Sequence, residues 1–325
     1  MRRVIGLVLV GLGAFLLVLA AMLRFYAVPA LAKAPLSPGE NSGGVTQTDQ
    51  EGIARSLFDP ATLTERKDVE VTATRFTRGD VPAAETEEAK SQDLAVYDSF
   101  LRLEDPEGVV VNASTIRVAF DRVTSELVNC CGVNNDGAQV TWEGINPLKF
   151  PMFTQQQDYD YFDTTLNKAY PAKFMGVEEL EGLEVYKFQQ VIEPTEYATL
   201  EVPGDLVGAD TPSYEAPRFY GVNLTMWVEP TTGSIVKGVN EQLQTLRGPD
   251  GTDQVTIIDS TIGTSPAEVT EGVEDAKSSA GLIKTLNNTV PLIALILGII
   301  LVVVGFLLAA RRSPSAADSD TVTNV

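Results

Sequence analysis

The stretch AVYDSFLRLEDPEGVVVNASTIRVAF, residues 95–120, contains two runs in which apolar and polar residues alternate. A period of two is typical of β-strands that bury one face. Between the runs, Asp105-Pro106-Glu107-Gly108 places proline and glycine where a type I turn favours them. The sequence therefore predicts an antiparallel hairpin here.

The same alternation continues on both sides of this hairpin. Residues 69–72 have the sequence VEVT, and LEVYKFQQVI (183–192) and DQVTIIDSTI (253–262) supply further strand candidates. Long helical patterns are absent between these runs, which favours a sheet made of sequential antiparallel strands. We therefore predict a mainly β domain, folded as a curved antiparallel sheet or as a sandwich.

Two apolar segments lie at the ends of the chain. Val4–Leu23 is a run of twenty residues without a charge, and Leu292–Ala310 is a run of nineteen residues that are apolar or glycine. At about 1.5 Å per helical residue, each spans roughly 30 Å, the thickness of the hydrocarbon core of a bilayer. They predict transmembrane helices, which we assign to residues 1–24 and 291–310.

Basic residues flank both segments on the side of the chain ends. Arg2 and Arg3 precede the first segment, and Arg311 and Arg312 follow the second. Because basic flanks stay in the cytoplasm, we expect a two-pass protein of the inner membrane with both termini cytoplasmic, a cytoplasmic tail at 311–325 and an extracytoplasmic central domain. The alternative is a cleaved signal peptide, which would export the central domain as well.

The remaining boundaries follow from composition and periodicity. Residues 25–50 are rich in proline, glycine, serine and threonine and predict a linker, which leaves 51–264 for the β domain. Residues 265–290 begin with the capping box Ser265-Pro266-Ala267-Glu268 and predict an amphipathic helix. Its apolar positions are Val269, Val273, Ala276, Ala280 and Ile283.

The composition limits the chemistry that this chain can perform. It contains no histidine, which removes histidine-based acid–base catalysis and most zinc sites. Glu178 with Glu179, or Asp158, Asp160 and Asp163, could act on sugars or bind calcium. In a chain of net charge −20, a solvated acidic surface is the simpler interpretation. We predict no enzyme, no catalytic residue, no metal, no cofactor and, because negative charge repels phosphate, no nucleic-acid partner.

Cys130 and Cys131 are adjacent, and they are the two cysteines of the chain. Neighbouring α-carbons lie about 3.8 Å apart, below the usual disulfide range of about 4.4 to 6.8 Å. In an oxidising compartment, a disulfide between these neighbours, two free thiols and intermolecular bridges all remain open.

Two regions concentrate aromatic residues. In the run Tyr220–Leu246, Met226 and the other apolar residues point one way, whereas Trp227 lies on the otherwise polar face and needs cover from a second protein layer or from a ligand. The second region could line an apolar groove or form the core. Its aromatic residues are Phe150, Phe153, Tyr159, Tyr161, Phe162, Phe174, Tyr186 and Phe188.

The order and spacing of several short motifs resemble the actinobacterial PorA-like envelope proteins, a family with two membrane spans around an exported β domain. The motifs are Asp121-Arg122, Lys149-Phe150-Pro151, Tyr161-Phe162-Asp163, Gly182-Leu183, Tyr186-Lys187-Phe188 and Trp227-Val228-Glu229-Pro230-Thr231-Thr232-Gly233. The resemblance implies a membrane-anchored protein of mycolate-bearing actinobacteria, linked with polar envelope growth, mycolate glycolipid traffic and lipoglycan maturation. It supplies no catalytic residue. The tryptophan hairpin is also similar to that of LolA-like lipoprotein carriers, which fold as a curved sheet over an apolar cavity.

These observations lead to a functional hypothesis. We predict a non-enzymatic envelope protein that binds or transfers an apolar lipid or a mycolate-type glycolipid. The alternative is a scaffold that recruits an envelope transporter, synthase or glycosyltransferase. A pore is disfavoured, because the apolar helices lack a polar channel face and the β domain lacks a lipid-facing band. The predicted apolar walls of the lipid site are Trp227, Phe150, Phe162, Phe174 and Tyr186.

Overall fold

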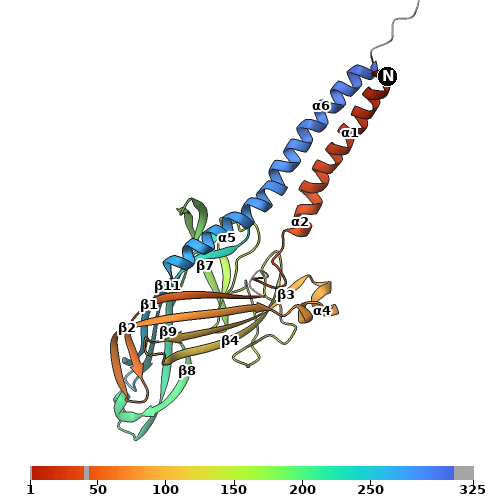
Figure 1. Ribbon diagram of the computed structural model, residues 1–325. Coiled ribbons are helices and arrows are strands. Elements are labelled where there is room, and N and C mark those ends of the chain that lie inside the picture. Colours follow the sequence, from red (N-terminus) through yellow and green to blue (C-terminus); the bar gives the residue numbers. More distant parts are fainter. Residues whose placement is uncertain (1, 40–43, 311–325) are drawn as a thin grey trace, which may run out of the picture. The chain divides into compact units, whose positions relative to one another are not determined.

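The computed structural model describes residues 2–39 and 44–310 (Figure 1). It divides into two compact units. One contains the chain up to Ala32 together with the chain from Gly281 onward, and the other extends from Lys33 to Ala280. Arg311, Arg312 and the predicted tail at 311–325 lie outside the described residues.

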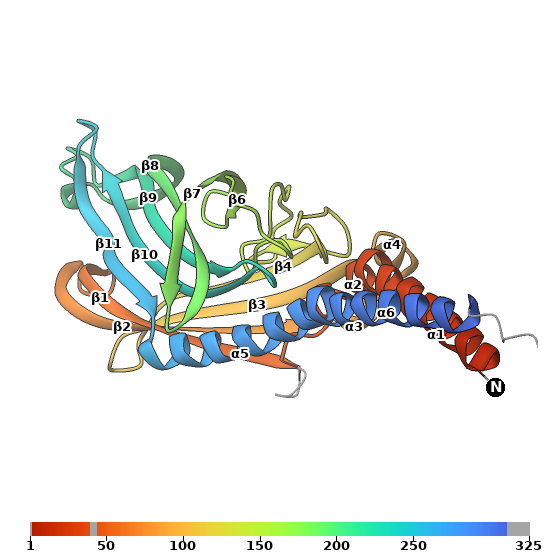
Figure 2. The same cartoon turned by 90° about the horizontal axis from the view of Figure 1, so that it is seen from above.

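In the part of the chain that the structure describes, eleven strands form one antiparallel sheet in the order β5-β4-β3-β2-β1-β11-β10-β9-β8-β7-β6. They are β1 (Val45–Asp59), β2 (Thr64–Gly79), β3 (Leu94–Glu104), β4 (Val110–Asp121), β5 (Asn134–Asn135), β6 (Tyr159–Asp163), β7 (Lys168–Leu180), β8 (Leu183–Pro203), β9 (Ser213–Glu229), β10 (Ser234–Arg247) and β11 (Asp253–Thr264). The prediction of a mainly β, antiparallel fold is confirmed, and of its two forms the sheet is the curved one, a curled half-barrel (Figure 2).

The hairpin predicted at residues 95–120 joins β3 to β4. One side-chain oxygen of Asp105 accepts the N–H groups of Glu107 at 3.0 Å and Val109 at 2.9 Å, which closes the turn. Arg66 on β2 donates to the other oxygen at 2.7 Å. The turn is therefore fixed both by its own backbone and by a neighbouring strand.

The hydrophobic core identifies the concave face of the sheet. Tyr97 on β3 and Phe120 on β4 pack in one cluster with Phe162 on β6, although β6 lies at the opposite end of the strand order. Strands so far apart in a sheet can share a cluster only if the sheet curls with these side chains inside. Isolated bridges from Phe120 to Leu127, from Glu126 to Ile145 and from Ile145 to Tyr161 together link β4 to β6 through the intervening segment.

Helix α5 (Pro266–Lys284) covers part of the convex face. Ser265 caps α5 by accepting the N–H of Glu268 at 3.3 Å, as expected for a capping box. Val269 and Val273 of α5 pack against Val185 of β8. The other helices of the sheet unit are α3 (Val81–Ala84), α4 (Glu87–Ser91) and the 3-10 helix η3 (Gly204–Val207).

The predicted linker at 25–50 needs a correction. Helical structure continues to Leu31, and β1 begins at Val45. After Leu31, the Ala34 N–H donates to the Arg122 carbonyl at 2.8 Å, and the Tyr97 hydroxyl donates to the Pro35 carbonyl at 2.6 Å, which attaches Ala34 and Pro35 to the sheet. Composition alone predicted a tether, because it does not register hydrogen bonds to residues some 60 to 90 positions away.

The helical unit contains two long apolar helices that run side by side (Figures 1 and 2). Its elements are α1 (Arg2–Met22), the π-helix η1 (Leu23–Ala27), α2 (Val28–Leu31), the π-helix η4 (Thr285–Thr289) and α6 (Val290–Ala310). A β-carbon added at Gly6 would lie 2.6 Å from the Gly305 carbonyl oxygen, and one at Gly13 would lie 2.7 Å from that of Gly298. These glycines therefore permit the close contact between the helices, whereas Gly11 has open space around it.

Among the described residues, two helices are long and apolar enough to cross a membrane, namely Arg3–Ala27 and the continuous segment Pro266–Ala310. Their polar ends are joined within the helical unit. The Arg24 guanidinium donates to the Asn287 carbonyl at 3.2 Å and to the Asn288 side chain at 2.8 Å. The two helices thus form a hairpin-like pair held by glycine contacts along its length and by hydrogen bonds at one end.

Candidate functional site

The structure places the five predicted wall residues in three different environments. Phe150 is fully buried and packs against Phe188 with ring centroids 4.6 Å apart. Phe174 and Tyr186 are partly buried, lie 5.7 Å apart and join the same cluster. Phe162 packs instead against Trp142 at 4.5 Å in the cluster of β3 and β4.

Trp227 lies on the convex face, away from the other four. It packs at the edge of the cluster made by α5 and β8, which includes Val269. Its ring lies 4.6 Å from the Lys237 ammonium and 5.2 Å from that of Lys187, and its Nε1 donates to Glu178 at 2.6 Å. Protein atoms therefore cover part of this half-buried tryptophan, and the structure does not bring the five residues together as one apolar wall.

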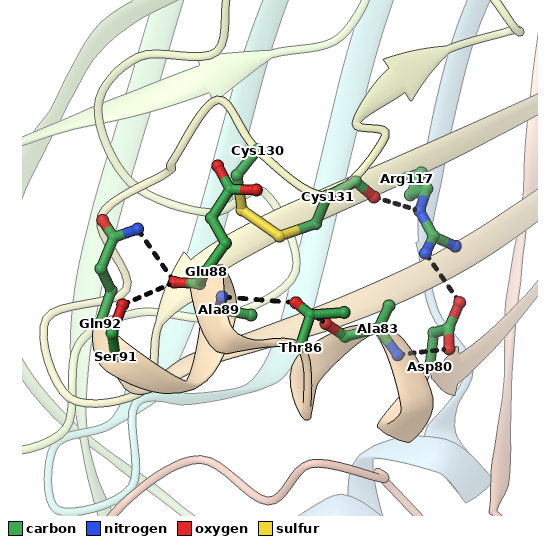
Figure 3. Close-up of a disulfide and its surroundings, with 10 residues drawn as sticks. All are labelled: Asp80, Ala83, Thr86, Glu88, Ala89, Ser91, Gln92, Arg117, Cys130 and Cys131. Carbon is green, nitrogen blue, oxygen red and sulfur yellow. Dashed lines mark hydrogen bonds and ion pairs between the residues drawn. A yellow bond between two sulfur atoms is a disulfide. The ribbon is translucent and has the colours of Figure 1, made fainter.

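The structure joins Cys130 and Cys131 by a disulfide on the convex side of β4 (Figure 3). Cys130 is buried in a cluster with Ala84 of α3 and Ala89 of α4. Arg117 donates from Nε to the Cys131 carbonyl at 3.0 Å and from Nη2 to Asp80 at 2.7 Å. The disulfide is thus part of the layer that attaches the two short helices to the sheet.

A buried turn connects two of the motifs that carry the family resemblance. Glu229, at the end of β9, is fully buried and accepts the N–H groups of Thr231 at 3.0 Å and Thr232 at 2.7 Å. Gly233 has a φ of +72°, and a side chain there would collide with the Phe150 carbonyl. The Phe150 N–H donates to the Gly233 carbonyl at 2.8 Å, so the two motifs interlock.

Lys149 completes this junction. Its ammonium donates to the carbonyls of Phe150 at 2.8 Å and Thr232 at 2.9 Å. Burial lowers the pKa of Lys149 to about 8. The lowered pKa means that the buried charge of Lys149 is destabilised by its surroundings. Its ammonium nevertheless stabilises the turn, because it donates hydrogen bonds to two backbone carbonyls.

A second polar group lies inside the curled sheet. The buried Asp163 of β6 accepts the Leu166 N–H at 2.7 Å, the Thr165 N–H at 3.0 Å and the Tyr220 hydroxyl of β9 at 3.0 Å. Burial raises the pKa of Asp163. Asp163 was one of three aspartates singled out from the sequence, and the structure gives it a bracing role between β6 and β9.

Arg75 of β2 also lies on the concave face, where it is paired across the sheet with Thr48 and Leu101. Its Nη1 donates to the Ser99 hydroxyl at 3.4 Å. Burial lowers the pKa of Arg75. Arg75 was not among the residues predicted for a site, although Val71, Ala73 and Arg75 occupy the same face of an alternating strand.

Two pockets open on the surface of the sheet unit. One, of about 500 Å³, is bordered by Phe76, Arg78, Asp98 and Phe100 on the convex face. The other, of about 430 Å³, is bordered by residues of the 123–160 segment that include Asp158 and Asp160. Within residues 2–39 and 44–310, no group of three or more histidine, cysteine, aspartate and glutamate side chains could hold a metal ion. Of the acidic pair Glu178 and Glu179, the Glu178 carboxylate forms an ion pair with the Lys187 ammonium at 3.0 Å.

The curled sheet and the paired apolar helices define a class: a membrane protein with an antiparallel β unit between two terminal helices. A family model described as "Porin PorA" matches residues 5–307, and the chain belongs to this family. The family resemblance inferred from the sequence is therefore confirmed.

Two curated relatives share the description "Porin PorA". The protein of Corynebacterium resistens is 28% identical and covers 96% of this chain and 98% of its own, and that of Corynebacterium amycolatum is 26% identical with 74% and 77% covered.

Solved structures add no argument beyond this family. An exported protein of Bacteroides fragilis with a YmcC-like fold covers 67% of this chain and 92% of its own at 10% identity, but with a TM-score of 0.20. A putative lipoprotein of Parabacteroides distasonis covers 66% and 92% at 8% identity with a TM-score of 0.19. Scores this low do not support a shared fold.

The family assignment corrects the functional hypothesis. The prediction of a protein that binds or transfers a lipid or glycolipid is wrong, because the family and both relatives are described as porins. The expectation that disfavoured a pore is overturned by the same description. The same description gives no support to the scaffold alternative.

Proposed function

We propose that this protein is a non-enzymatic, channel-forming protein of the actinobacterial cell envelope. The observation that carries the proposal is the match of the porin family model to residues 5–307, which includes both apolar helices and the whole sheet. The full-length alignment with the porin of Corynebacterium resistens supports it further.

The physical character of the surfaces limits how such a channel is built. Helix α1 carries no charge from Val4 to Met22, and α6 is apolar throughout, so one copy cannot enclose a polar path within the membrane. The convex face of the sheet carries ion pairs such as Arg55 with Asp259, which excludes it from contact with lipid. We infer that several copies assemble around the path, with the sheets outside the membrane.

For the topology we propose that both termini face the cytoplasm and that the sheet lies on the external side of the inner membrane. Arg2 and Arg3 before the first helix support this orientation. A phosphatase reporter fused after Thr264 should be active, because it would fold outside the cytoplasm. An active reporter fused before Arg2, or an inactive one after Thr264, would reverse the orientation.

Planar-bilayer recording of the full-length protein tests the channel itself. Purified protein should give discrete conductance steps whose frequency rises faster than linearly with protein concentration, as expected for an assembly. Gly13→Leu should abolish the steps, because its side chain would enter the contact with Gly298, whereas Gly11→Leu, which meets open space, should retain them. Folded wild-type protein that gives no steps above the detergent control at any concentration would refute the channel.

A further inference from the structure

The position of Arg75 sets it apart from other basic residues of the sheet. Ala73, Arg75 and Thr77 alternate on one face of β2, and Thr77 pairs with Ser99 on β3. Ser99 and Tyr97 share a face of β3, and Tyr97 packs inside the curl against Phe120. Arg75 therefore projects from β2 toward the interior of the half-barrel, where the residue is half-buried.

Most arginines of the sheet unit have a carboxylate partner. Ion pairs are formed by Arg55, Arg66, Arg78, Arg102, Arg117, Arg122 and Arg247. Among the described residues, Arg75 has no such partner, and its hydrogen bond to Ser99 is long at 3.4 Å. The Ser99 hydroxyl is shared with Thr77 at 3.1 Å.

Tyr161 of β6 lies within electrostatic range of Arg75 but does not supply a negative charge. Its hydroxyl donates to the Pro147 carbonyl at 2.6 Å, and burial raises its pKa, so the phenol stays neutral. A guanidinium has five N–H donors. In the described chain most of these donors of Arg75 have no protein partner, and a half-buried guanidinium without a carboxylate neighbour attracts an anion that can accept them.

We propose that Arg75 binds a small carboxylate anion inside the curled sheet, with the hydroxyls of Thr77 and Ser99 beside it. A planar guanidinium fork matches the two oxygens of a carboxylate through parallel hydrogen bonds. The net charge of −20 disfavours multiply charged anions, which makes a monovalent carboxylate a better match than phosphate. This site goes beyond the proposed channel and does not depend on it, since binding requires only the folded sheet.

The test uses full-length protein in a non-ionic detergent and isothermal titration with sodium acetate, sodium phosphate or sodium chloride at constant ionic strength. Acetate should bind saturably with one site per chain and more tightly than phosphate or chloride. Arg75→Gln should weaken acetate binding by about tenfold or more, the loss expected when a charge-assisted hydrogen bond is removed. The matched control Arg78→Gln alters a convex, exposed arginine paired with Asp98 and should leave the affinity unchanged.

Thermal unfolding measures the stability of each variant and, independently, whether acetate stabilises it. In acetate-free buffer, Arg75→Gln should have a Tm equal to or higher than that of wild type, because the charge that is removed is half-buried and has no carboxylate partner in the described chain. Acetate should raise the Tm of wild type and of Arg78→Gln but not that of Arg75→Gln. Absence of saturable acetate binding to wild type, equal binding by Arg75→Gln, or tighter binding of phosphate than of acetate would each overturn the proposal.

Discussion

Arginines on the two faces of the curled sheet differ in the partners that they contact. On the convex face, Arg117 forms ion pairs with Asp80 at 2.7 Å and Asp98 at 2.8 Å. On the concave face, Arg75 meets a hydroxyl, and Arg218 meets the Gln244 amide at 3.3 Å and lies 5.1 Å from the centre of the Tyr197 ring. Arg117 is therefore neutralised by the chain, whereas Arg75 and Arg218 are held by neutral groups.

The two kinds of partner differ in how much they contribute to the stability of the fold. Exposed ion pairs contribute about 0 to 1 kcal/mol, because water and salt screen them. Buried polar groups contribute or cost several times more, because nothing replaces a lost partner. Substitutions on the concave face should consequently have the larger effects on stability.

The largest effect should come from the aromatic packing of the concave face. Phe188→Ala removes a fully buried ring that contacts Phe150 at 4.6 Å and Phe174 at 5.7 Å. The loss should be about 3 to 5 kcal/mol of unfolding free energy, measured by urea denaturation in detergent. Val191→Ala, on the convex face of the same strand and 54% exposed, should change stability by less than about 0.5 kcal/mol. Equal losses for the two variants would show that the assignment of the faces is wrong.

The next effect concerns Asp163, which accepts hydrogen bonds from β6–β7 backbone groups and from Tyr220. Asp163→Ala should cost about 2 to 4 kcal/mol, because three donors lose their acceptor. Asp163→Asn retains an acceptor without the charge and should cost less. Both variants are compared with wild type by urea denaturation at pH 4 and pH 7.

The pH dependence of Asp163 has a defined sign. Since burial raises its folded pKa above the ordinary value of 3.8, its contribution to stability is present at low pH and is lost as pH rises through the folded pKa. The stability of Asp163→Asn relative to wild type should therefore improve from pH 4 to pH 7. A relative stability that worsens over this interval would mean that the buried group is held as a carboxylate.

The strands and turns of the fold could be predicted from the sequence, but the concave and convex faces of the sheet could not. Alternation located the turn at Asp105–Gly108 and placed Trp227 on the face opposite to Met226, because a period of two is local. It could not say which face would be concave, since that depends on contacts between strands as distant as β3 and β6. For that reason Trp227 was grouped with Phe150, although the sheet separates them.

The polar interior was less accessible to prediction than the strands. Arg75 could have been noticed as a cation at an apolar position of its strand, but whether a distant carboxylate would meet it depends on the tertiary fold. The position of Lys149 at the Glu229 turn was equally invisible, because the two segments are about 80 residues apart in sequence. The attachment of Ala34 to Arg122 likewise depends on backbone hydrogen bonds that no composition reveals.

A smaller effect should appear at Lys149. Burial lowers its pKa from 10.5 to about 8, so the unfolded chain binds more protons than the folded one between these values, and stability contributed by this group rises with pH. The expected slope is at most about 1.4 kcal/mol per pH unit. Lys149→Met should remove it. Urea denaturation of both proteins at pH 7.5, 8.5 and 9.5 measures the difference, and parallel curves for the two proteins would contradict the lowered pKa.

The smallest effect should come from the convex ion pairs, and it sharpens the comparison between the faces. Arg55→Gln removes the pair with Asp259, in which the arginine side chain is 55% exposed. Because such pairs are largely screened by solvent, unfolding free energy should change by about 0.5 kcal/mol or less, and by still less in 0.5 M salt. The concave counterpart Arg75→Gln should leave stability unchanged or raise it, since it removes a charge that the described chain does not neutralise. If both substitutions destabilised the protein equally and salt abolished both effects, the two faces would be electrostatically alike, and the distinction between arginines with and without a carboxylate partner would fail.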